Sequence, residues 1–110
     1  MAWVILVLAA GFEVVWASSM KASEGFTRPI WVVSTVAAAA ISFWLLAHAM
    51  KSIPLGSAYA VWTGLGAVGA FVVGVIAFKE PLTAGRLASA LLVLAGIVGF
   101  WLTSSDNPST

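Results

Sequence analysis

The sequence predicts an all-α membrane protein with four transmembrane helices, because of its composition and the positions of its charged residues. Of the 110 residues, 62% are hydrophobic and 8% are charged, and the mean hydropathy is +1.08. Soluble domains are about 45–50% apolar and about 25% charged. The charged residues divide the chain into four apolar blocks, each close to the roughly 20 residues that a helix needs to cross a bilayer. We therefore expect a single transmembrane domain over residues 1–105.

The first apolar block runs from Met1 to Met20 and contains one ionisable side chain, Glu13. The block lacks the positively charged N-terminal region of a signal peptide, and three comparable blocks follow it. We therefore expect a retained helix over about residues 2–20. In the charged loop that follows, Thr27 is expected to cap the second helix, with Pro29 in its first turn.

The other three blocks are uncharged stretches separated by short connections. The second block carries a run of four alanines, and the third carries five glycines. Thr83 follows the last connection and is expected to cap the fourth helix. The expected helices cover about residues 30–50, 54–78 and 84–103, and a frayed tail is expected at 106–110.

The charges and residue types exclude several function classes. A formal net charge of +1, with the cations scattered singly, does not suit a nucleic-acid partner. The chain has no Cys and one His, so it offers no thiolate or histidine cluster for a metal, and no other cofactor is indicated. No nucleophile and base lie at a spacing that suits catalysis, so we do not expect an enzyme.

The short connections require the four helices to run up and down as neighbours within the lipid bilayer. Four helices of this size have too little interior to enclose a pathway for a solute, so we expect an oligomer. On the fourth helix, Ser89 and Gly96 lie seven residues apart, with Leu92 and Val93 between them. These small residues predict a seam for close packing against a second copy of the chain.

Glu13 is the residue that points most directly to chemistry. An ionised acid in mid-span costs about 2.5–3.5 kcal/mol, and such residues are usually functional. On a helix, Glu13 shares its face with Ala9, Ala10 and Trp16. The alanines are expected to leave room beside the carboxylate, and the Trp16 indole can orient it. The site can hold a proton or a cation; the alternative is a permanently protonated Glu13 that hydrogen-bonds a neighbouring helix.

A second group of candidate residues lies on the third helix, where Tyr59, Trp62, Thr63 and Gly66 share one face. The rings of Tyr59 and Trp62 could stack on a flat cation or donate hydrogen bonds to the carboxylate. The alternative is an aromatic belt at the membrane interface. Gly64 and Gly66 predict either a hinge or a close helix crossing.

For two isolated polar residues of the second helix, the residues around them favour an ordinary structural role over a functional one. Ser42 lies in an apolar tract, where bonding back to its own helix is the simplest expectation. His48 lies beside Lys51 near the end of the block, so a solvated or interfacial position is expected.

Four segments together resemble the small multidrug resistance family, and more specifically its guanidinium exporters. They are GFEVVWA at 11–17, SEGFTR at 23–28, IPLGSAYAVWTGLG at 53–66 and KEPLT at 79–83. The first segment is the most useful for the subtype, because exporters of polyaromatic cations in the same family typically lack a Trp at the position of Trp16.

The resemblance implies an antiparallel, dual-topology homodimer in the bacterial inner membrane that exchanges guanidinium-type cations for protons. Glu13 of both subunits would bind substrate or proton, and Gly64 and Gly66 would form the bend that alternates access. The alternatives are an exporter of quaternary ammonium or polyaromatic cations and, from another class, a non-transporting membrane subunit. The residues that the resemblance places around Glu13 are Trp16, Ser42, Tyr59 and Trp62, with Thr63 as a further candidate from the shared face.

The loop charges argue for one orientation in the membrane. Lys21, Arg28, Lys79 and Arg86 lie in or beside the first and third loops, whereas Lys51 alone lies at the opposite side. The positive-inside rule would place both termini outside. A dual-topology homodimer requires both orientations, and we retain it because the motifs are more specific than this bias.

Overall fold

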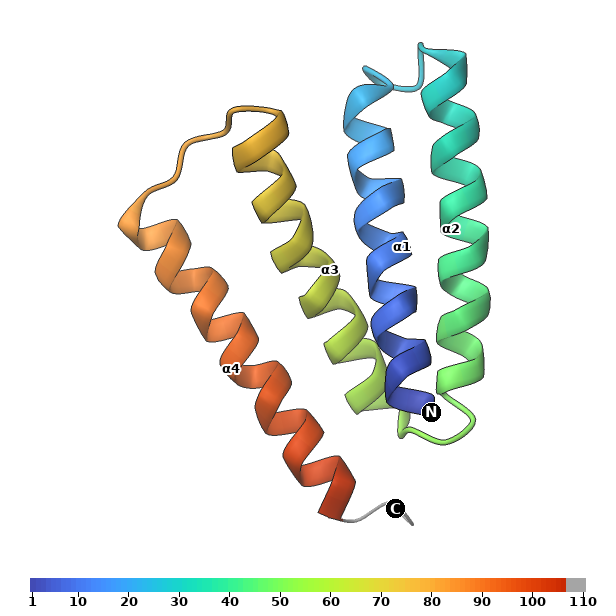
Figure 1. Cartoon of the computed structure of the whole chain (residues 1–110), viewed down its shortest axis with the longest axis vertical. Coiled ribbons are helices and arrows are strands. Elements are labelled where there is room, and N and C mark those ends of the chain that lie inside the picture. The colour runs from blue at the N-terminus through green and yellow to red at the C-terminus, as the bar shows by residue number, and fades with distance from the viewer. Residues whose placement is uncertain (107–110) are drawn as a thin grey trace.

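The computed structural model describes residues 1–106, with side chains described as far as residue 103, and this part of the chain is all-α (Figure 1). The expected ranges agree with the observed helix ends to within one turn. Asp106, expected in the tail, ends the fourth helix, and the rest of that tail, 107–110, lies outside the described residues. The helices are α1 (Ala2–Ala22), α2 (Pro29–Ala49), α3 (Leu55–Ala77) and α4 (Ala84–Asp106).

All four helices are long and apolar enough to cross a membrane. They contain 21, 21, 23 and 23 residues, and at about 1.5 Å per residue each exceeds the roughly 30 Å hydrocarbon core of a bilayer. Large apolar side chains such as Ile30 and Leu92 are exposed on the outside of the helices. This surface suits a lipid solvent.

The helices form a flat arrangement rather than a closed bundle. The molecule measures 45 × 34 × 17 Å, and Figure 1 shows the order α2, α1, α3, α4 across its width. The backbone of α4 approaches only that of α3 among the described helices. No residue of the apolar stretch of α4 is buried. Most of α4 is therefore free to contact lipid or another chain.

The loop between α1 and α2 differs from the expectation, because Thr27 does not cap α2. Its hydroxyl donates to the carbonyl oxygen of Glu24 at 2.9 Å. The cause is the turn before it, in which Glu24, Gly25 and Phe26 have φ of 51°, 74° and 65°. The turn directs the Thr27 hydroxyl back into the loop, and α2 begins at Pro29 without a side-chain cap.

The loop between α3 and α4 has the expected cap. The backbone N–H of Arg86 donates to the Thr83 hydroxyl at 3.2 Å, which satisfies a free donor of the first turn of α4. At the other end of the loop, the N–H of Glu80 donates to the carbonyl oxygen of Gly74 at 3.0 Å. The Glu80 carboxyl group packs over Gly74, where a Cβ atom would overlap with it.

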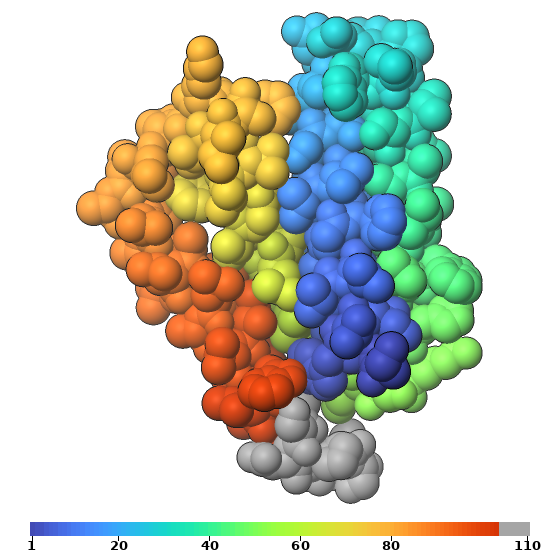
Figure 2. Space-filling model, viewed as in Figure 1, coloured from blue at the N-terminus to red at the C-terminus, as the bar shows by residue number. Residues whose placement is uncertain are grey.

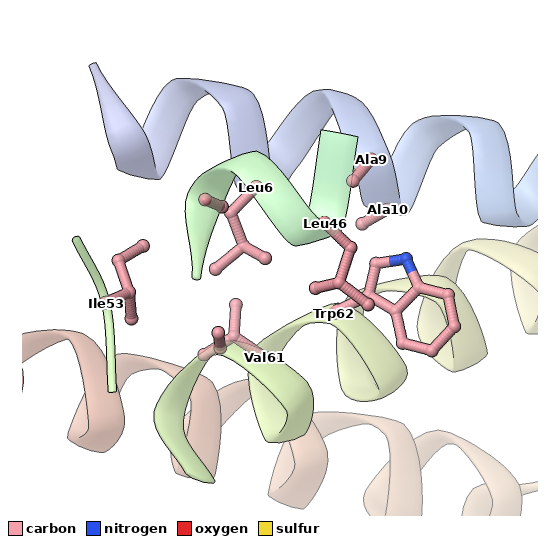
Figure 3. Packing of buried hydrophobic residues seen from close by; sticks show 9 residues of the cluster. Leu6, Ala9, Ala10, Leu46, Ile53, Val61 and Trp62 are labelled. Atoms are coloured by element: carbon pink, nitrogen blue, oxygen red, sulfur yellow. The ribbon is translucent and has the colours of Figure 1, made fainter. Parts of the chain in front are cut away.

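The apolar core lies where α1, α2 and α3 meet near the loop between α2 and α3 (Figure 3). Ala9 and Ala10, expected to leave room beside Glu13, are buried in this core instead. Their small side chains allow the neighbouring helices to approach α1 closely. The larger side chains of the core are Leu6, Leu46, Ile53, Val61 and Trp62.

Candidate functional site

Glu13 lies near the middle of α1, on the side that faces α3. The side chain is half-buried, and its carboxyl group packs against the backbone of Gly66, where a Cβ atom would overlap with it. The Oε1 atom is fully buried and has no hydrogen-bond partner in the part of the chain that the structure describes. A buried acceptor without a partner costs about 1–3 kcal/mol, and more if it is charged. The position is therefore one that a proton or a cation would stabilise.

Trp16 lies one turn further along α1 and has an unpaired hydrogen-bond donor, whereas Glu13 has an unpaired acceptor. Its indole Nε1 is also buried and lacks a hydrogen-bond partner among the described residues. Its ring packs against Phe43 of α2, with centroids 6.3 Å apart. Native proteins leave few buried polar groups unsatisfied. The described residues therefore leave one acceptor and one donor unpaired one turn apart on α1.

Ser42 connects three helices. Its hydroxyl donates to the carbonyl oxygen of Ala9 on α1 at 2.6 Å and accepts the indole N–H of Trp62 on α3 at 3.0 Å. The expectation of a bond back to its own helix is therefore wrong. The reason is that Ala9 has no bulky side chain, so α1 and α2 lie close enough for the hydroxyl to reach the α1 backbone.

The aromatic side chains form a row beside this connection. Phe43 lies between Trp16 and Trp62, with its ring centroid 5.6 Å from that of Trp62, and Tyr59 follows at 5.7 Å from Trp62. Tyr59 is 55% exposed, so one end of the row is open. We did not predict Phe43, although its position next to Ser42 in the sequence was the available signal.

The predicted site residues are thus brought to one region, without direct hydrogen bonds to the acid. Within residues 1–103, no hydrogen bond joins Glu13 to Trp16, Ser42, Tyr59 or Trp62. Thr63 lies one position beyond Trp62, and its side chain is exposed.

Both glycines of the expected hinge occupy close helix contacts. A Cβ on Gly64 would lie 3.1 Å from side-chain atoms of Val93 and Ile97 on α4, and Gly66 faces Glu13 on α1. Through both positions, α3 is one continuous helix. The structure therefore displays the close-packing role, and the hinge remains a prediction.

The predicted packing residues of α4 lie on its free surface. The Ser89 hydroxyl donates to the carbonyl oxygen of Gly85 in its own helix at 2.9 Å, and nothing lies within 4 Å of a Cβ built on Gly96. A second helix could approach this surface closely.

The residue types at the site suit an organic cation better than a metal. No group of three or more His, Cys, Asp or Glu side chains could hold a metal ion among the described residues. His48 lies at an exposed end of α2, where its ring packs 4.2 Å from that of Trp44. A single carboxyl group beside aromatic rings can attract one cation or one proton.

The sequence was compared with known families and proteins. The family described as Small Multidrug Resistance protein matches residues 1–94. A protein named guanidinium exporter from Yersinia pseudotuberculosis serotype I (strain IP32953) is 50% identical over 104 residues, which is 94% of this chain and all of the relative. Proteins of the same name from Escherichia coli (strain K12) and Citrobacter freundii are 50% and 44% identical over 104 residues, covering 94% of this chain and 99% of each relative.

Proposed function

Because the chain belongs to the small multidrug resistance family, we propose that it is a proton-coupled antiporter that exports guanidinium and small substituted guanidinium ions. One observation carries this proposal: the buried Oε1 atom of Glu13, in the middle of a membrane span, has no partner within the described residues. The names of the relatives support the choice of cation. The four spans make it a multi-pass membrane protein, and the bacterial sources of the relatives support our proposal that this membrane is a bacterial inner membrane.

Guanidinium would supply the hydrogen-bond donors and the positive charge that the Glu13 carboxyl group lacks among the described residues. It is planar, stays protonated at physiological pH and can donate two parallel hydrogen bonds to one carboxylate. The aromatic row that includes Phe43 and Trp62 offers ring faces against which a flat cation can pack. The hydrogen bonds from Trp62 to Ser42 and from Ser42 to Ala9 would hold the Trp62 ring in place while the cation binds.

Competition for one carboxyl group would couple export to proton entry. Glu13 can be neutralised by a proton or paired with guanidinium, and both forms avoid an isolated charge in a low-dielectric interior. An empty ionised site would be costly to move between the two sides of the membrane. Exchange of one ligand for the other therefore follows if only loaded sites change sides.

A second copy of the chain would complete the site. The free indole N–H of Trp16 needs an acceptor, and a carboxylate of the second copy's Glu13 would provide one. The exposed surface of α4 around Ser89 and Gly96 would supply the contact between the copies. In an antiparallel dimer, bending at Gly64 and Gly66 would let two identical chains adopt different conformations and exchange them.

Proton flux in vesicles tests this function. The full chain is reconstituted with a pH-sensitive dye inside, and guanidinium is added outside. We expect guanidinium to drive proton movement with the unmodified chain and none with Glu13→Gln. The matched control is Glu80→Gln, which changes an acid in the loop after α3, outside the proposed site, and should retain exchange.

The same assay distinguishes the alternatives. Proton movement driven by a bulky quaternary ammonium ion and not by guanidinium would show that the subtype is wrong. No proton movement with either cation in the unmodified chain would favour a non-transporting membrane subunit.

A further inference from the structure

The ends of α1, α2 and α3 enclose an open cavity at the face of the molecule that carries most of the positive charge. Its volume is about 850 Å³. Lys21 at the end of α1 and Arg28 at the start of α2 both line it. So do two aromatic rings, those of Trp31 on α2 and Phe78 after α3. In Figure 2, the space-filling surface is notched at this end, between the end of α3 and the end of α1.

Lys21 and Arg28 are available for an external anion. Neither side chain makes a hydrogen bond or an ion pair with another of the described residues, although Glu24 also lines the cavity. Two cationic side chains and one anionic side chain leave the cavity lining positive. The cavity also lies at the ends of three membrane spans, the level at which lipid headgroups meet the protein.

We propose that this cavity binds the phosphate group of an anionic phospholipid. Arg28 can bind a phosphate with two parallel hydrogen bonds, and Lys21 adds a point charge. Trp31 and Phe78 provide apolar surface for the glycerol and upper acyl carbons, as aromatic rings at membrane interfaces do. A free phosphate ion would leave this apolar part of the lining unused, which favours a lipid as the source of the phosphate. The proposal does not depend on Glu13 or on the exported cation.

Lipid retention tests the proposal. The full chain is reconstituted into vesicles of phosphatidylethanolamine with a minor fraction of phosphatidylglycerol, then extracted in mild detergent, and the bound lipids are counted by mass spectrometry. We expect phosphatidylglycerol to be enriched over its share of the vesicle. The double variant Lys21→Gln/Arg28→Gln should retain at least about fivefold less, because it loses two charge-assisted contacts.

Two controls keep the test specific. Lys51→Gln/Lys79→Gln removes the same amount of charge from residues that do not line the cavity, and it should retain the lipid. Glu24→Gln removes the anion from the lining and should increase retention, an effect that damage to the fold would not produce.

Three results would overturn the proposal. The first is no enrichment of phosphatidylglycerol in the unmodified chain. The second is an equal loss of lipid in both double variants, which would indicate nonspecific attraction. The third is displacement of the lipid by inorganic phosphate added alone, which would make the cavity a site for the free ion.

Discussion

The carboxyl group of Glu13 on α1 lies against the backbone of Gly66 on α3, so closely that the structure has no space for a Cβ atom at residue 66. The acid is thus positioned by the packing of two helices. Any movement of α3 past α1 would change the surroundings of the carboxyl group. This contact links the proposed bending of α3 to the proposed binding of cation and proton.

Gly66→Ala is expected to displace the Glu13 carboxyl group and weaken guanidinium binding at least about tenfold, or about 1.4 kcal/mol. Gly56→Ala is the matched control, because it lies on the same helix and nothing is within 4 Å of its Cβ position. Both variants replace a glycine of α3 by alanine, a better helix former, so neither change is expected to weaken the helix itself. Isothermal titration with guanidinium measures the difference. Equal affinities for the two variants would show that the contact with Glu13 has no role in binding.

Ser42→Ala is expected to lower the free energy of unfolding by about 1–3 kcal/mol, because it leaves the buried N–H of Trp62 without an acceptor. Thr35→Val is the comparison. Among the described residues, the Thr35 hydroxyl donates only to a carbonyl oxygen of its own helix, that of Trp31 at 2.7 Å, so its loss should cost less. Unfolding in detergent, followed by tryptophan fluorescence, checks both values. A cost for Thr35→Val as large as that for Ser42→Ala would contradict the importance of the connection between helices.

Gly96→Leu is expected to dissociate the dimer, since it places a large side chain where a second α4 would approach. Ala95→Leu adds a similar volume about 100° around the helix and should leave the dimer intact. Chemical cross-linking in vesicles measures the fraction of dimer for each variant. Full cross-linking of Gly96→Leu would place the dimer contact elsewhere.

Ser52→Cys is expected to be labelled by a membrane-impermeant thiol reagent from both sides of the membrane. The chain has no other cysteine, and Ser52 is exposed in the loop between α2 and α3. Labelling from both sides follows if the chain inserts in both orientations despite the bias of its Lys and Arg residues. Labelling from one side only would exclude the dual-topology homodimer.

The positions of the four helices could be read from the sequence, because the charges of this chain lie almost entirely in loops and at span ends. Glu13 stood out for the same reason, as the one acid deep within a span. The cap at Thr83 also followed from local signals. These features depend on hydrophobicity and on residues close together in the chain.

The contacts between helices could not be predicted in this way. The pairing of Gly66 with Glu13 and the bond from Ser42 to Ala9 depend on how the helices rotate about their axes. The hydrophobic surface of these helices extends almost all round and does not fix that rotation. Thr27 was misassigned because three successive residues with positive φ redirect the loop, and only one of them is a glycine.

Competition between protons and guanidinium for Glu13 is tested most directly by equilibrium binding of guanidinium at a series of pH values. We expect binding to weaken as the pH falls, by about tenfold per pH unit where one proton must leave for each cation that binds. Glu13→Gln should remove both the binding and its pH dependence. Guanidinium affinity that stays constant across the pH series, or that persists in Glu13→Gln, would contradict competition at Glu13.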